Sequence, residues 1–546
     1  MDDISETPEP RRARDRSFYA ALFAVVLPLW AVVPASWLFV AHSLFTSRVW
    51  RFGVAGQTAF FLALCEVLFS LHHYHLATHV AGLSPFTPAD IAEIQVAFRR
   101  MLKAGMANLP EDGGDPESLF TERPGSPEEE IVKLQRHDPR AIDFRNCLRT
   151  WFCKVPWSHI KRRNLERWLY WAMYNSELPE SDKIPAQYRK VMDSGLDLLQ
   201  KRLGCQLEEG ENPSLSAMTL TIDPVQIWSR PFAFYALVKS ANWWLRGHYL
   251  REYNVRHGRH NGLEYLIRYP AGGWDHFNDP RPLVFIHGLG LGLVQYHLTL
   301  SHLFQSVTDR PILVIIQPHI SQDIFHPHFL EPLNRHQFGE KLTALLKKLD
   351  WIDGHDYYGD STEYEEEDEI KVAKALNAKK HGVTLLSHSN GSYIHAWILK
   401  NHPRIVKRSC FVDPVTFCSW EGDVCYNFLY RTPKTGIELL MKYFVGTELG
   451  VANLLQRHFD WVSNSLWYEE IPNARDPSKT LFVMGGQDAI INATRIKHYL
   501  TSHGIRKNLC YDPDAKHGQA LMSGGIGHTE IFRWLNEPEH HPEPFH

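Results

Sequence analysis

Cysteine is scarce in this sequence and forms none of the patterns that would make it a structural element. The 546 residues include 8 cysteines, and no two of them form a CxxC pair. We therefore expect neither a disulfide framework nor a structural zinc site, and we expect the protein to reside in a reducing compartment. Cys147 and Cys153 are close enough in sequence to bridge in an oxidising compartment, but we expect ordinary reduced thiols.

A basic excess is also missing. The chain has 58 Lys and Arg residues against 62 Asp and Glu, a net charge of −4, so no general field gathers nucleic acid or another polyanion. Apolar residues are plentiful: 44% of the residues are hydrophobic and 17 are Trp. The chain can therefore bury a sizeable core, and its length predicts two or three folded units.

Charge is absent over one long stretch near the N-terminus. Between Ser17 and Ser47 there is no Asp, Glu, Lys or Arg. This run exceeds the roughly 20 residues that a bilayer requires and is too long for a signal peptide, so we predict a retained transmembrane helix. A second apolar run, 52–71, is interrupted only by Glu66; it either spans as the return arm of a hairpin or lies at the interface. We favour the hairpin, with residues 17–80 as the membrane anchor.

Two features predict the side of the membrane on which the rest of the chain lies. Four arginines within the tail 1–16 precede the first run, and they keep that tail cytosolic. The N-x-S/T sequons begin at Asn390 and Asn492, beside candidate catalytic residues, where a glycan would obstruct. A cytosolic domain on the endoplasmic reticulum or another endomembrane is expected. If the second run does not span, the domain is lumenal and Asn492 becomes a glycosylation candidate.

Histidines follow the second apolar run, at His72, His73, His75 and His79. His75 and His79 would share one helix face and could hold a metal ion. Because the sequence has only one such cluster, we expect a polar cap at the membrane interface and no metal site.

The middle of the chain, 81–250, has helical apolar spacing, as residues 158–174 illustrate. A segment rich in Pro, Gly and acidic residues, 108–130, predicts an exposed loop. The strongly acidic segment 359–369 predicts a second solvated loop, to which no function is assigned.

Short β-rich runs alternate with helical stretches from 251 to 536, followed by a tail, 537–546. The runs are LVFIHG, ILVIIQ, VTLLSHS, SCFVDPV, TLFVMGG and NLCYD. Such alternation predicts an α/β domain with a mostly parallel sheet and helices on both faces.

One run continues as Ser-His-Ser389-Asn-Gly391, a strand, a tight turn and a helix start. This is the pattern of a nucleophile elbow, in which a strained turn holds the central Ser at the carboxyl edge of the sheet. Gly391 fits the usual G-x-S-x-G pattern, whereas Ser387 replaces its first glycine. A small substitute is sterically acceptable there, so Ser389 is the predicted nucleophile.

A glycine-rich turn after an earlier strand, His287-Gly-Leu289-Gly-Leu-Gly, can supply a backbone N–H. Together with the N–H of Asn390, the N–H of Leu289 would form an oxyanion hole, in which each donor is typically worth about 3 kcal/mol. His287 is expected to pack beneath the turn.

Two later runs provide an acid and a base. Asp488 follows the strand TLFVMGG, and His517 follows the last strand, so the chain order is Ser, Asp, His. Asp413 also ends a strand and is the alternative acid. His528 is the rival base, but it falls in a predicted terminal helix.

A largely helical insertion, at about 414–475, interrupts the sheet and is rich in aromatic residues. As a lid it would line an apolar acyl pocket, or its aromatics would form its own core. These residues are Trp420, Tyr426, Phe428, Tyr430, Trp461 and Trp467.

With these motifs, residues 260–536 resemble the α/β-hydrolase superfamily, and the strings FVDPVTF, YNFLYRTP and LGVANLLQRHF resemble fungal membrane-anchored hydrolases. The resemblance implies cleavage of an ester or related bond through an acyl-enzyme, and we expect a lipid or other hydrophobic ester as substrate, with no cofactor or metal. Two alternatives stay open: an acyltransferase with the same triad, and a catalytically silent scaffold that binds a lipid or a partner protein.

Overall fold

The computed structural model describes residues 3–10, 12–82, 84–85, 90–104, 131–275, 278–352 and 382–538. The loops predicted at 108–130 and 359–369 lie outside these ranges, as does the predicted tail after Pro538.

A single sheet of eight strands organises the second half of the chain, in the order β1-β2-β4-β3-β5-β6-β7-β8. β2 runs antiparallel to both β1 and β4, and all other neighbours are parallel. The strands are β1 (Arg256–His260), β2 (Leu263–Arg268), β3 (Leu283–Ile286), β4 (Ile312–Ile316), β5 (Val383–His388), β6 (Val406–Val412), β7 (Thr480–Gly485) and β8 (Leu509–Asp512). The last six coincide with the six predicted runs.

The hairpin of β1 and β2 is absent from the sequence-based prediction. β1 is the polar, largely exposed edge strand RHGRH, so it lacks an apolar run. Its signal is the turn Asn261-Gly262, where both residues have positive φ, 47° and 84°. Asn-Gly is the preferred pair for a two-residue hairpin.

Helices cover both faces of the sheet, as predicted for an α/β-hydrolase fold. Alternate residues of each strand point to opposite faces. Leu283 and Phe285 pack with α10 and α19, whereas Val284 and Ile286 pack with α11, α13 and α18. These helices are α10 (His297–Ser306), α11 (Arg335–Lys348), α13 (Gly391–Asn401), α18 (Ala493–Ser502) and α19 (Ile526–Asn536). The predicted fold is confirmed.

A helical region precedes the sheet and packs against the insertion between β6 and β7. The region contains α4 (Ile91–Lys103), α6 (Pro139–Leu148), α7 (Arg162–Tyr174), α8 (Ala186–Leu203) and α9 (Phe232–Tyr253). The insertion contains α14 (Asp423–Cys425), α15 (Gly436–Met441), α16 (Leu449–Arg457) and α17 (Trp461–Asn464). Trp151 Nε1 donates to the carbonyl of Trp420, and Trp461 Nε1 to that of Ala172. These hydrogen bonds join the helical region to the insertion.

The aromatic residues of the insertion form its own core. Trp420 stacks on Trp467 with ring centroids 4.1 Å apart, and both are buried. Tyr430 donates a 2.5 Å hydrogen bond to Asp223 of the helical region. Of the two interpretations left open, a pocket lining or a core, the contacts favour the core.

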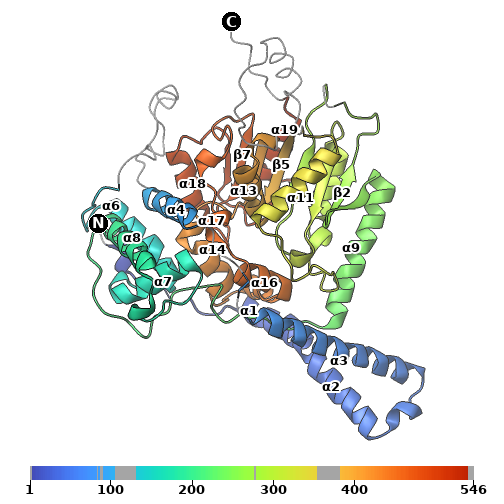
Figure 1. Cartoon of the computed structure of the whole chain (residues 1–546). Helices are drawn as coiled ribbons and strands as arrows, with labels where there is room; N and C mark the ends of the chain where they lie inside the picture. The colour runs from blue at the N-terminus through green and yellow to red at the C-terminus, as the bar shows by residue number, and fades with distance from the viewer. Residues whose placement is uncertain are drawn as a thin grey trace.

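An α-helical hairpin projects from the body (Figure 1). Its first arm is a continuous helix from Arg16 to Phe45, containing α1 (Arg16–Ala21) and α2 (Leu27–Phe45), and its second arm is α3 (Val54–Val80). Both arms are long and apolar enough to cross a membrane. The start of the first arm packs on the insertion, where Phe18 contacts Leu439 and Tyr443.

Glu66, the charge that interrupts the second apolar run, is buried at the base of this hairpin. Its two carboxylate oxygens accept the backbone N–H of Phe232 at 2.8 and 3.0 Å, at the first turn of α9. The carboxylate therefore satisfies a helix N-terminus, where a negative charge is favourable.

The N-terminal tail returns to the body. Asp3 forms a 2.8 Å ion pair with the buried Arg145, and Arg149 donates to the carbonyl of Thr7 at 2.7 Å. The N-terminal tail is thus held against the helical region of the body.

Candidate active site

Ser389 lies in a sharp turn between β5 and α13. Its φ is +52°, in the left-handed region that costs a non-glycine residue backbone strain. Gly391, at the start of α13, allows the turn because a Cβ there would lie 2.3 Å from the carbonyl oxygen of Ile286. The sequence thus folds locally as the predicted elbow, with Ser389 at the carboxyl edge of the sheet.

Ser387, which replaces the first glycine of the motif, has a buried partner. Its Oγ lies 2.9 Å from Nδ1 of His395, and Nε2 of that ring lies 3.1 Å from Oγ of Ser409. Burial lowers the pKa of His395 to about 3, so the ring is neutral and can accept at one nitrogen while it donates at the other. The hydroxyl at position 387 is therefore satisfied, which explains how a polar residue fits there.

The structure brings Ser389, Asp488 and His517 together. His517 Nε2 lies 2.9 Å from Ser389 Oγ, and His517 Nδ1 lies 2.6 Å from Asp488 Oδ2. The other carboxylate oxygen of Asp488 accepts the N–H groups of Ile490 and Ile491, at 2.7 and 3.1 Å. One oxygen of Asp488 is thus held by the backbone, and the other orients the imidazole of His517.

The protonation of His517 follows from its neighbours. Burial lowers its pKa, but the charge of Asp488 and the hydrogen bond to it outweigh burial, so the pKa is raised above its ordinary value. A carboxylate on Nδ1 fixes the tautomer that leaves Nε2 free to accept the serine proton.

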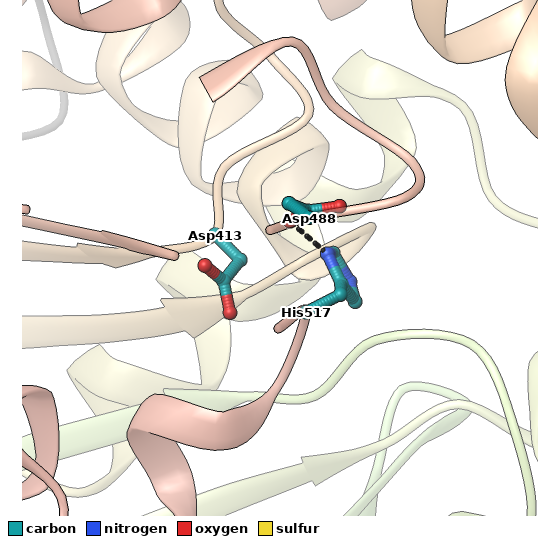
Figure 2. A group of neighbouring side chains, drawn as sticks. All are labelled: Asp413, Asp488 and His517. Carbon is teal, nitrogen blue, oxygen red and sulfur yellow. Dashed lines mark hydrogen bonds and ion pairs between the residues drawn. The ribbon is translucent and has the colours of Figure 1, made fainter. Parts of the chain in front are cut away.

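Asp413 lies beside the same histidine but makes different bonds (Figure 2). Its oxygens accept the backbone N–H of Gly485, at 3.1 Å, and of Gly518, at 2.7 Å. Burial raises its pKa to about 6. Asp413 therefore ties the end of β7 to the loop that carries His517, and the hydrogen bond to the ring comes from Asp488.

His528, the rival base, lies in α19 as predicted and has another partner. Its Nε2 is 2.8 Å from Nδ1 of His302. Nothing connects it to Ser389 in the described part of the chain.

The glycine turn after β3 packs directly on Ser389. A Cβ on Gly288 would lie 2.9 Å from Cβ of Ser389, so only glycine allows this approach. Within the described residues, the N–H groups of Leu289 and Asn390 donate no hydrogen bond to the chain. Both N–H groups can therefore donate to a ligand, and their role as an oxyanion hole stays a prediction. His287 is buried beneath the turn, where its Nε2 accepts the N–H of Gln317 at 3.2 Å.

Two further residues support this turn, and sequence reasoning missed both roles. The hydroxyl of Tyr296 accepts the N–H of Gly288 at 2.8 Å and lies 2.7 Å from Nδ1 of His388. His388 directly precedes Ser389, so a buried chain of hydrogen bonds joins the glycine turn to the turn that carries Ser389. Tyr296 carried no signal, since its partner is a backbone group eight residues away.

Asp413, Asp488 and His517 also place three possible metal ligands within 4.8 Å of one another. Their ligand atoms are already used: Asp488 bonds the ring, and Asp413 accepts two backbone N–H groups. The hydrogen-bonded arrangement accounts for the cluster without an ion.

Of the histidines predicted to form a polar cap after the second apolar run, His73 is buried against Phe69 and Tyr235.

A cavity of about 610 Å³ lies at the same carboxyl edge of the sheet, near the end of α3. Its lining includes Gln317 and Pro318, which follow β4 as Ser389 follows β5. None of the three residues Ser389, Asp488 and His517 is among the described residues that line it. Its apolar wall includes Val80, Leu330, Phe338, Ile394, Trp397 and Leu454.

No protein-family model matches the sequence, and no curated protein matches it. Solved structures that the chain resembles include the following three. A membrane phospholipase A, described as a bacterial virulence factor, is 12% identical over 56% of this chain and 92% of its own, with a TM-score of 0.33. A carboxylesterase from Bacillus subtilis is 9% identical over 55% and 99%, with a TM-score of 0.31. An alpha/beta hydrolase enzyme from a lagoon-sediment metagenome is 14% identical over 51% and 97%, with a TM-score of 0.29.

Proposed function

We propose that this chain is a serine hydrolase that cleaves carboxylic esters through an acyl-enzyme. The observation that carries the proposal is the pair of hydrogen bonds through His517, 2.9 Å to Ser389 Oγ and 2.6 Å to Asp488 Oδ2. A serine hydroxyl is a weak nucleophile until an adjacent base takes its proton, and this arrangement places such a base on it.

The steps follow from the atoms in place. Nε2 of His517 takes the proton of Ser389 while Oγ bonds to the ester carbon, and the N–H groups of Leu289 and Asn390 stabilise the oxyanion. The tetrahedral intermediate then breaks its bond to the alcohol oxygen, which receives the proton from Nε2. Water repeats the sequence on the acyl-enzyme and releases the acid. Asp488 stabilises the imidazolium in both halves.

A hydrophobic ester, such as a lipid, is the substrate class that the surroundings favour. The 610 Å³ cavity at the same sheet edge has an apolar wall and is lined in part by His79 and Val80 of α3. It therefore adjoins the arm proposed to lie in the membrane. Pockets for drug-sized and cofactor-sized ligands are typically of this volume and lining.

The hairpin is proposed to anchor the enzyme in an endomembrane, with the sheet domain in the cytosol. Support comes from the ion pair of Asp3 with Arg145, which keeps the N-terminal tail on the side of the domain. A single span would separate them. The arginines of that tail favour the cytosolic side. Membership among fungal membrane-anchored hydrolases stays a prediction from the strings FVDPVTF, YNFLYRTP and LGVANLLQRHF.

The test is hydrolysis of a short, water-soluble ester by the detergent-solubilised full chain, with Ser389→Ala as the control. We expect measurable hydrolysis by the wild type and none by the variant, whose melting temperature should be unchanged because only one hydroxyl is removed. A silent scaffold would hydrolyse nothing in either form. An acyltransferase would form the acyl-enzyme but transfer it to an added alcohol in preference to water.

A further inference from the structure

The helix α9 is apolar on two opposite sides. One side packs on the sheet through Leu245 and Tyr249, both buried. The opposite side exposes large apolar side chains, although a helix on the surface of a soluble domain ordinarily turns polar residues to water. These are Leu237, Trp243, Trp244 and Leu250, with 68%, 75%, 55% and 51% of their surface exposed.

α9 begins at the base of the hairpin and is joined to it. Glu66 of α3 accepts the N–H of Phe232 at the start of α9, and Phe69 packs on Phe232 and Tyr235 with centroids 5.6 and 5.4 Å apart. From there α9 runs along the outer edge of the sheet, away from the hairpin (Figure 1). Its exposed face is therefore continuous with the proposed membrane anchor.

The charged residues of the hairpin indicate where the contact between α3 and the start of α9 lies relative to the bilayer. Residues 52–65, between Arg51 and Glu66, carry no charge, and such a segment is about 21 Å long as a helix. The long side chains of Arg48 and Arg51 at the tip add several ångströms, which together approach the roughly 27 Å hydrocarbon thickness of a thin endomembrane. With the tip arginines at the far surface, Glu66 and the start of α9 lie at the near surface.

The composition of the exposed side suits that depth. Tryptophan is enriched where the hydrocarbon of a bilayer meets its headgroups, because its ring is apolar and its N–H is polar. Two cations of α9 already form ion pairs, Lys239 with Asp323 and Arg246 with Glu264. Arg251 forms no ion pair with the described residues and can meet a lipid phosphate.

We propose that the outer face of α9, formed by Leu237, Trp243, Trp244 and Leu250, rests in the headgroup interface of the bilayer and holds the sheet domain flat on the membrane. The inference rests on the membrane anchoring stated under the proposed function. Its occupant is a lipid surface. A second copy of the chain or the transmembrane helix of another protein would need the same face, and the test separates them.

The test is photo-crosslinking of the full chain in vesicles of phosphatidylcholine and phosphatidylserine. p-Benzoylphenylalanine replaces Trp244 in one sample, Phe61 of the hairpin in a second, and Lys190 of α8 in a third. Phe61 is exposed on the hairpin, and Lys190 is exposed on α8. The helix α8 lies on the opposite side of the molecule from α9 (Figure 1). We expect lipid adducts at 61 and 244, at least about tenfold above those at 190, because only the first two positions lie in the membrane.

The outcomes are distinguishable. Adducts at 61 without adducts at 244 would overturn the α9 proposal and leave the anchor standing. Adducts at neither position would overturn both, and protein adducts at 244 would assign the face to a second copy or another chain. As a second measurement, Trp243→Ser/Trp244→Ser should lower hydrolysis of a vesicle-borne ester about tenfold while hydrolysis of a soluble ester is unchanged. Equal loss on both substrates would contradict a role at the membrane.

Discussion

The ends of β6 and β7 look alike in sequence and differ in use. Each is a buried parallel strand that ends near an aspartate, Asp413 after β6 and Asp488 after β7, and both carboxylates lie within 4.8 Å of a ring nitrogen of His517. Asp488 bonds that ring at 2.6 Å, whereas Asp413 accepts the N–H groups of Gly485 and Gly518. Distance to His517 therefore does not distinguish the two carboxylates, whereas their hydrogen-bond partners do.

The comparison also separates two kinds of contribution to one site. In the proposed mechanism, Asp488 acts on the charge and tautomer of the imidazole, which matter in the transition state. Asp413 holds the loop that places the imidazole, and that loop must be held before substrate arrives. Removing each carboxylate should therefore give different kinetic signatures.

Asp488→Asn should lower activity more than any change at Asp413 or Tyr296. The amide keeps the size of the side chain but stabilises the wrong tautomer and no longer stabilises the imidazolium, so kcat should fall about 10⁴-fold, the loss typical of this change in a Ser-His-Asp triad. Steady-state hydrolysis of a soluble ester measures this. A smaller loss than that of Asp413→Asn would move the acid to Asp413.

The pH dependence should change in the same variant. His517 must be neutral to accept the serine proton, so kcat/KM rises with pH through its pKa. Since Asp488 raises that pKa above the ordinary 6.5, the acid limb of the wild type should lie above 6.5. In Asp488→Asn the limb should move to lower pH. An unmoved limb would show that another group controls it.

Asp413→Asn should have an intermediate effect. An amide can accept only one of the two backbone N–H groups and turns its own N–H₂ toward the other, which leaves a buried donor unsatisfied at a cost of about 1–3 kcal/mol. We expect a lower melting temperature and an activity loss of roughly 10- to 100-fold, well below that of Asp488→Asn. A wild-type melting temperature would contradict the role of Asp413 in holding the loop.

Tyr296→Phe should have the smallest effect. It removes the hydroxyl that accepts the N–H of Gly288, so the neighbouring donor at Leu289 is less well placed. Complete loss of one oxyanion donor costs about 10²–10³ in kcat, and misplacement should cost about tenfold with KM unchanged. A rise in KM alone would show instead that Tyr296 contributes to substrate binding.

Much of the fold was predictable because the central strands are continuous apolar runs. All six predicted runs became β3 to β8, and Ser389, Asp488 and His517 follow β5, β7 and β8, as predicted. The edge hairpin of β1 and β2 was missed because its outer strand is polar and only the Asn-Gly turn marked it.

The sequence does not show which residues far apart in the chain form hydrogen bonds or pack together. In the sequence, Glu66 is only an interruption in an apolar run, whereas in the structure it accepts a hydrogen bond from the N–H of Phe232. The choice between Asp413 and Asp488, the support of Tyr296 and the exposed side of α9 depend on the same kind of information. Periodicity shows that a residue is apolar or polar, and only the fold shows what it faces.

The most direct test of the catalytic assignment is labelling with a fluorophosphonate probe, followed by peptide mapping of the adduct. The detergent-solubilised full chain should carry one phosphonyl group, on Ser389, because this hydroxyl has an imidazole 2.9 Å away that is itself held by an acid. Labelling should be abolished in Ser389→Ala. An unlabelled wild type, or an adduct on another residue that persists in Ser389→Ala, would contradict the assignment.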